Sequence, residues 1–200
     1  MSSIFPQNIT LTLYDPLAEL LGAEDGRFTY VFDDVVKLSG HACPTVAGAF
    51  LMTVHALHAL YGDETPQRGD IEITIHDAQD NGVTGPISQV FTLLTGAAAD
   101  NGFHGLAGRF ARSGLMKFLP GTTGPAPFVF ERRDTGAQIG VSYNPETIPV
   151  DPAMGANLQQ LIQGSGDEQV QQAFTTAWRD RVLAILADGG ESTVSITSIM

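Results

Sequence analysis

Residues 38–62 read LSGHACPTVAGAFLMTVHALHALYG, and this stretch decides the fold because it contains a turn followed by a long uncharged run. Pro44 suits the first position of a helix, where its missing N–H costs nothing, so we expect Cys43 to be the N-cap. No Asp, Glu, Lys or Arg occurs from there to Tyr61, and Gly62 is a suitable helix end. The stretch therefore predicts a helix over residues 44–61 that is buried on most of its circumference.

The same stretch places the only cysteine of the chain two residues after a histidine. In extended chain His41 and Cys43 point to the same side, and the positive end of the helix dipole favours a charged thiolate at Cys43. Such a pair can bind a soft or borderline metal ion, or it can act as a nucleophile and its base. The purely structural alternative is a buried cysteine that caps the helix and a histidine that bonds a carbonyl oxygen.

The other segments alternate between strand and helix patterns and predict an α+β fold, in which a mixed β-sheet packs on the buried core helix. Residues 70–76 alternate polar and apolar side chains over their whole length, which is typical of a half-buried strand. Residues 27–38 predict another strand, interrupted by a turn or bulge at Asp33 and Asp34. Further predicted elements are a helix at 16–21 that begins after Asp15, a helix at 86–94, and a hairpin of strands at 128–132 and 138–143.

The C-terminal quarter has a different character. Residues 1–150 are expected to form the α+β domain, and residues 151–200 a C-terminal helical extension packed on the same domain. Helices are predicted at 154–163 and 167–186, and the tail at 192–200 predicts a last strand, added to a sheet edge in this chain or in a second copy of it. Because apolar edge strands and glycine-rich loops usually need to be covered, we expect a homodimer.

Composition excludes several function classes. The 200 residues include 10 Lys and Arg against 22 Asp and Glu, which gives a net charge of −12, and 43% of the residues are hydrophobic. Such an acidic chain lacks the clustered cations that binding to nucleic acid or to an anionic membrane requires. One cysteine cannot form an internal disulfide, and the sequence has neither a basic leader nor a run of about 18 apolar residues. These features predict a cytoplasmic protein with no nucleic-acid and no membrane partner.

Residues 35–62, VVKLSGHACPTVAGAFLMTVHALHALYG, resemble the opening motif of the FmdE family, named after the E component of formylmethanofuran dehydrogenase. His41, Cys43 and Pro44 match the H-x-C-P element of that family. The resemblance covers residues 30–120 and includes the core helix, the strand at 70–76 and the segment QVFTLLTG at 89–96. It implies an FmdE-like α+β core and a zinc ion bound through the H-x-C element and further ligands.

The chain departs from the family pattern in ways that affect the metal site. Ser39 stands where the family has its first histidine, Thr45 where it has a glycine, and Ala97 where it has a second cysteine. The glycine-rich loop at 96–108 contains His104, and the resemblance places this loop near the H-x-C element. His104 is therefore the candidate that replaces the lost ligand, and the alternative is an ordinary loop histidine with a structural role.

Other polar residues suggest further sites. Side chains that could add ligands, although exposure is the expectation for them, are Asp33, Asp34, His76, Asp77 and Asp80. His55 and His58 lie three residues apart, but His55 is about 18 Å along the helix axis from Cys43 and cannot share a metal with it. The densest basic cluster, formed by Arg109, Arg112 and Lys117, marks either an anionic ligand or a set of ion pairs.

The preferred function is a zinc-binding FmdE-like protein, with the metal held by His41, Cys43 and His104 and completed by water or a small-molecule ligand. Three protein ligands and an open position would match a catalytic zinc site, which polarises a carbonyl or activates water. One alternative is an accessory or sensor module with a structural metal or a free thiolate. Another is a metal-free enzyme with Cys43 as nucleophile and His41 or His104 as base. The sequence identifies neither substrate nor reaction.

Overall fold

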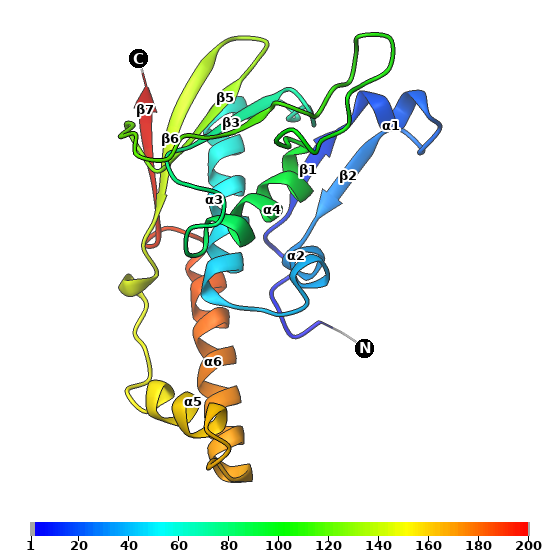
Figure 1. The fold of residues 1–200 in the computed structure, drawn as a ribbon. Helices are drawn as coiled ribbons and strands as arrows, with labels where there is room; N and C mark the ends of the chain where they lie inside the picture. The colour runs from blue at the N-terminus through cyan, green and yellow to red at the C-terminus, as the bar shows by residue number, and fades with distance from the viewer. Residues whose placement is uncertain (1–2, 200) are drawn as a thin grey trace.

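The computed structural model describes residues 3–199, which form the predicted α+β fold (Figure 1). Its strands are β1 (Leu11–Tyr14), β2 (Arg27–Tyr30), β3 (Ile71–Ile75), β4 (Met116–Phe118), β5 (Phe128–Arg132), β6 (Ala137–Tyr143) and β7 (Val194–Ile199). Its helices are α1 (Pro16–Leu20), α2 (Phe32–Ser39), α3 (Pro44–Tyr61), α4 (Thr84–Thr95), α5 (Met154–Ile162) and α6 (Glu168–Asp188), with a short 3-10 helix η1 (Pro145–Thr147). A mixed five-stranded sheet has the order β4-β3-β5-β6-β7, and β1 pairs with β2 in a separate sheet.

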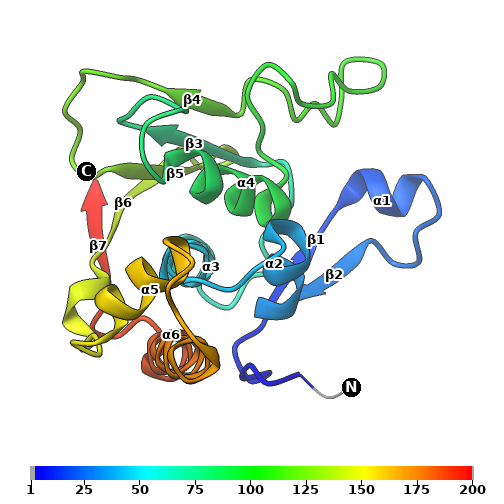
Figure 2. The same ribbon diagram turned by 60° about the horizontal axis from the view of Figure 1, so that its bottom comes forward.

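Helix α3 forms the centre of the molecule and has the predicted bounds. Its N-cap is Cys43, and Gly62 follows its last residue. Figure 2 shows the sheet on one side of α3, with α2, α4 and α6 around the rest of it. Because so many neighbours surround the helix, its buried residues occupy most of its circumference: Val46, Ala47, Gly48, Ala49, Phe50, Leu51, Met52, Thr53, Ala56, Leu57 and Tyr61. The prediction of a buried core helix is confirmed.

The strand with the clearest alternation occupies the middle of the main sheet. Ile71, Ile73 and Ile75 are fully buried, whereas Glu72 and Thr74 between them are partly exposed. β3 pairs antiparallel with β5 and parallel with β4, and β5 continues into β6 through a hairpin. The predicted strands at 70–76, 128–132 and 138–143 are confirmed, while β1 and β4 were not predicted.

The predicted strand at 27–38 is confirmed at 27–30, which form β2, but it is wrong for residues 32–38, which lie in helix α2. β2 ends at Tyr30, and α2 begins two residues later. The carboxylate of Asp34 accepts a hydrogen bond from the Val31 N–H at 3.1 Å, which satisfies a free donor at the helix start. Phe32 and Val35, three residues apart, are buried on one helical face. The Asp33-Asp34 pair is therefore neither turn nor bulge but the first turn of α2, and β2 belongs to the small sheet.

Residues 151–199 contribute both helices and a strand. Helices α5 and α6 lie where the sequence predicts them, and the first half of α6 extends with α5 beyond the rest of the molecule (Figure 1). The second half of α6 buries Val182, Ile185 and Leu186. β7 then pairs antiparallel with β6 at one edge of the main sheet. Within residues 3–199, no helix is both long enough and apolar enough to cross a membrane.

Candidate functional site

His41 lies in the turn between α2 and α3, and its imidazole is held in one orientation. Gly40 ends α2 in the left-handed conformation with φ 73°, which turns the chain toward α3. The Nδ1 atom of His41 lies 2.9 Å from the backbone oxygen of Ser39. A carbonyl oxygen accepts only, so Nδ1 carries the proton in this bond, and in the neutral ring the Nε2 atom keeps a free lone pair. His41 is exposed, and its Nε2 atom can act as a ligand or a base.

Ser39, which stands where the FmdE pattern has a histidine, stabilises this turn. Its hydroxyl lies 2.7 Å from the carbonyl oxygen of Val35 and 2.9 Å from that of His41. The hydroxyl links the last turn of α2 to the residue that precedes Ala42 and Cys43. Ser39 thus has a structural role in the turn.

The thiol of Cys43 is not used to cap the helix that it precedes. Cys43 has an extended backbone (φ −148°, ψ 166°), and its side chain accepts no hydrogen bond from the first turn of α3. It is a free cysteine and is partly exposed. Cys43 directly precedes the first turn of the 18-residue helix α3. The structural alternative is thus met in part: Cys43 is the N-cap residue and packs partly buried against the core, and His41 bonds a carbonyl oxygen, but the thiol itself makes no capping hydrogen bond.

Two aromatic side chains fix the backbone on either side of Cys43. The indole N–H of Trp178 donates to the Ala42 oxygen at 2.8 Å, and the hydroxyl of Tyr143 donates to the Pro44 oxygen at 2.9 Å. Burial raises the pKa of Tyr143, Arg181 opposes this, and the negative charge of Cys43 raises it further. Tyr143 therefore remains a neutral hydrogen-bond donor, and the backbone around the thiol is anchored to both β6 and α6.

His104 is not brought to this pair. It is exposed in the α4–β4 loop, and contacts of this loop hold it near α1. There the Arg112 N–H donates to the Phe103 oxygen at 2.7 Å, and the Arg112 side chain pairs with Asp15 in front of α1. Figure 1 shows this loop beside α1, whereas the α2–α3 connection lies near the opposite end of α3. The structure thus does not place the third predicted ligand beside His41 and Cys43, which are neighbours in the chain.

The donor atoms of the pair suit zinc, but the pair is two ligands. Zinc binds imidazole nitrogen and thiolate sulfur, and its protein sites use three or four such ligands. Within residues 3–199, no group of three or more His, Cys, Asp and Glu side chains is arranged to hold a metal ion. If the pair held a metal ion, it would supply two of the ligands, and the remaining positions would belong to water, a ligand or another chain.

The other predicted ligand candidates make hydrogen bonds that do not involve His41 or Cys43. The Nε2 atom of His55 lies 2.7 Å from the Gly189 oxygen and so joins α3 to the end of α6. The Nδ1 atom of His76 lies 2.7 Å from the Thr122 hydroxyl. Asp77 accepts hydrogen bonds from the Ala78 N–H, the Asn81 amide and the Thr84 hydroxyl, and so organises the start of α4. His58 and Asp80 are exposed, and among residues 3–199 they form no metal-holding group with the other candidates.

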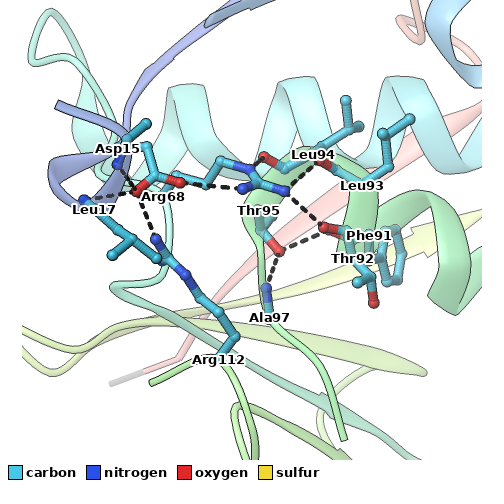
Figure 3. A network of polar contacts seen from close by, with 11 residues as sticks. Asp15, Leu17, Arg68, Phe91, Thr92, Leu93, Leu94, Thr95, Ala97 and Arg112 are labelled. Atoms are coloured by element: carbon cyan, nitrogen blue, oxygen red, sulfur yellow. Dashed lines mark hydrogen bonds and ion pairs between the residues drawn. The ribbon is translucent and has the colours of Figure 1, made fainter. Parts of the chain in front are cut away.

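A buried ionic network that the sequence did not predict centres on Asp15 (Figure 3). Asp15 caps α1 as predicted, and the same carboxylate also accepts from Arg68 at 3.1 Å and from Arg112 at 2.7 Å. The Arg68 guanidinium in addition donates to three carbonyl oxygens at the C-terminus of α4, those of Thr92, Leu93 and Leu94. The network thus joins the N-terminus of one helix to the C-terminus of another.

Arg112 is buried because Gly69 leaves room for it. A Cβ atom on Gly69 would lie 1.1 Å from the Nη1 atom of Arg112, and Gly69 also has φ +84°. Of the predicted basic cluster, Arg112 belongs to this network and Lys117 pairs with Glu72. The sequence could not show that Asp15, Arg68 and Arg112 form one network, because Arg68 and Asp15 lie 44 and 97 residues from Arg112 in the chain. Arg112 contacts Asp15 directly, and Asp15 in turn contacts Arg68.

No protein-family model matches the chain, and no curated protein is significantly similar to it. The resemblance to the FmdE family therefore depends on the motif residues, chiefly His41, Cys43 and Pro44.

Proposed function

We propose that His41 and Cys43 form the functional pair of this protein, that they bind one divalent metal ion, and that zinc suits their donor atoms best. The observation that carries the proposal is the turn geometry, in which the Ser39 oxygen holds Nδ1 and leaves the Nε2 atom of His41 free. A metal-bound histidine commonly has its second nitrogen fixed in this way. The thiol of Cys43, which is free of any capping bond, is the second ligand.

Two protein ligands give a weaker site than three or four, so we expect partial occupancy at low zinc concentration. When bound with open positions, zinc would supply a Lewis acid that polarises a carbonyl or activates water. The residues of the chain hold the ion and orient the imidazole. The same pair could instead hold a metal ion in an accessory or sensor protein. That role involves no catalysis and needs no open coordination position on the metal.

The test is equilibrium dialysis of the full chain against zinc, followed by elemental analysis. Cys43→Ser and His41→Ala should abolish bound zinc, whereas His58→Ala, which removes an exposed histidine elsewhere on α3, should not change it. His104→Ala should also leave zinc unchanged, because its loop lies near the other end of α3. Undiminished zinc in Cys43→Ser would refute the proposal, and lost zinc in His104→Ala would restore His104 as a ligand.

A metal-free thiolate is the second candidate, favoured by the two-ligand count and by the free Nε2 atom of His41. In this case Cys43 is a nucleophile and His41 takes up the thiol proton. Alkylation of metal-free protein by iodoacetamide then proceeds faster in wild type than in His41→Ala. Equal alkylation rates in wild type and His41→Ala would show that His41 does not activate the thiol. If wild type also binds zinc, the result supports the metal site over the nucleophile.

We further propose membership in an FmdE-like group, based on the motif residues His41, Cys43 and Pro44. The proposal includes a cytoplasmic location, supported by the single cysteine, and an unidentified small-molecule ligand. It also includes a homodimer, supported by β7, an edge strand in which Ile196 is 37% exposed.

A further inference from the structure

A cavity lies away from His41 and Cys43, between α1, the segment before β3 and the α4–β4 loop. Its volume is about 470 Å³, which lies in the range of small-molecule binding sites. Four arginines line it, namely Arg68, Arg109, Arg112 and Arg133. They are four of only ten Lys and Arg residues in a chain of net charge −12. Positive charge is therefore concentrated in this cavity, although the chain as a whole is acidic.

The carboxylates nearby do not balance these four charges. Asp70 is the one acidic residue that lines the cavity, and Asp15 lies behind Arg68 and Arg112 and is shared by both. Four positive charges thus face two negative ones. Burial lowers the pKa of Arg112, Asp15 opposes this, and the nearby charge of Arg68 lowers it again, as expected where cations outnumber anions. An anion in the cavity would relieve this excess.

The four arginines have different roles. Arg68 and Arg112 are fixed by Asp15, and the Arg112 side chain is only 9% exposed, so these two form a rigid floor. Arg133 has its nearest carboxylate, Asp70, at 3.8 Å, which is too long for a hydrogen bond. Its donors are available to a ligand.

Arg109 is the exception among the cations of the protein. Nine of the ten Lys and Arg side chains have a carboxylate oxygen within 4.0 Å, but among residues 3–199 Arg109 has none. Its guanidinium instead lies 4.8 Å from the centre of the Phe110 ring. In a protein with more than twice as many acids as bases, a cavity-lining arginine with no carboxylate partner among residues 3–199 points to a ligand.

The backbone beside Arg109 is strained. Ala107 and Phe110 have φ values of 48° and 62°, and a bulky residue such as Phe rarely adopts this left-handed conformation. Within the described chain, the N–H groups of Phe110 and Ala111, two residues that line the cavity, donate to no protein acceptor. Backbone strain of this kind concentrates at ligand-binding segments, and unpaired N–H groups are suitable donors for an anion.

We propose that this cavity binds a small organic anion, whose phosphate or carboxylate group is held by Arg109 and Arg133 above the floor formed by Arg68 and Arg112. The planar guanidinium presents paired N–H donors that match the oxygen atoms of both groups.

The test is isothermal titration calorimetry of the full chain with inorganic phosphate and with succinate, at matched ionic strength set with sodium chloride. Wild type should bind one of the two anions, and Arg109→Gln and Arg133→Gln should each weaken that binding about ten-fold. Arg179→Gln is the control, since that exposed arginine on α6 pairs with its neighbour Asp180 and lies outside the cavity. Thermal unfolding of each variant verifies that it is folded.

Preference for phosphate or for succinate identifies the source of the anionic group, and either preference supports the proposal. Binding that is unchanged in Arg109→Gln and Arg133→Gln would overturn it, as would no heat with either anion. The site is independent of the proposed metal pair, so anion binding should be the same in Cys43→Ser. A failure of the protein to bind zinc would therefore not contradict the anion site. A failure to bind either anion would likewise not contradict the metal site.

Discussion

At the scale of single residues, Asp15 combines three roles in one carboxylate. Its carboxylate caps α1, pairs with Arg68 and pairs with Arg112, and it is only 4% exposed. Removal of one partner from a buried ionic group leaves the others uncompensated, and this costs more free energy than the intact group contributes. Asp15 should therefore be far more sensitive to substitution than the exposed acids of the chain.

We expect Asp15→Asn to lower the free energy of unfolding by about 3–5 kcal/mol, because it keeps the size of the side chain but leaves two arginine charges without their carboxylate. The measurement is urea denaturation followed by circular dichroism. Asp25→Asn is the control, since Asp25 faces Arg27 at 3.7 Å on the surface and should change stability by less than about 1 kcal/mol. A similar effect of the two substitutions would contradict the assigned role of Asp15.

At the scale of secondary-structure elements, local signals predicted what local interactions determine. The bounds of α3 followed from Pro44 and Gly62, and the alternation in residues 70–76 indicated β3, because both patterns act within a few residues. The error at α2 has the same physical basis. β-branched and aromatic residues favoured a strand, but the hydrogen bond from Val31 to Asp34 and the buried spacing of Phe32 with Val35 favour a helix.

Features that depend on distant partners could not be predicted. β4 is three residues long and exists through its pairing with β3, more than forty residues earlier in the chain. The Arg68 and Arg112 contacts with Asp15 join residues 53 and 97 positions apart. For the candidate site, the sequence supplied the adjacent pair His41 and Cys43. The position of His104 depended on the path of a long loop, which no local pattern determines.

The start of α4 gives a prediction about pH. Hydrogen bonds from Asn81 and from the Ala78 N–H lower the pKa of Asp77. A carboxyl group with a lowered pKa in the folded chain stabilises the fold above its unfolded pKa, about 3.9, and this contribution is lost as the pH falls through the folded pKa. Between about pH 5 and about pH 2, Asp77→Asn should therefore lose less unfolding free energy than wild type.

Chemical denaturation at a series of pH values measures this difference. The Asp80→Asn variant is the matched control, because Asp80 is exposed nearby in the same loop and should give a pH profile parallel to that of wild type. If the Asp77→Asn profile were also parallel to wild type, the hydrogen bonds to Asp77 would not contribute to stability.

At the scale of the whole molecule, the acidic surface and the open sheet edge act in opposite directions on self-association. A net charge of −12 makes copies of the chain repel one another at low salt, with the repulsion screened as ionic strength rises. β7 presents an edge that pairs only with β6 on its inner side, and Ile196 is partly exposed there. An unprotected edge of this kind favours pairing with a second copy.

We expect wild type to sediment as a dimer at micromolar concentration, with the dimer fraction increasing with salt, because screening reduces the repulsion between two acidic copies. Ile196→Lys should shift the protein toward monomer, since a charged side chain on an edge strand opposes edge-to-edge pairing. Ile162→Lys makes the same change at a residue that is 78% exposed at the end of α5, away from the sheet, and should leave the dimer intact. A monomeric wild type would rule out the dimer. Equal dissociation by both variants would show that added charge, and not the edge of β7, controls the assembly.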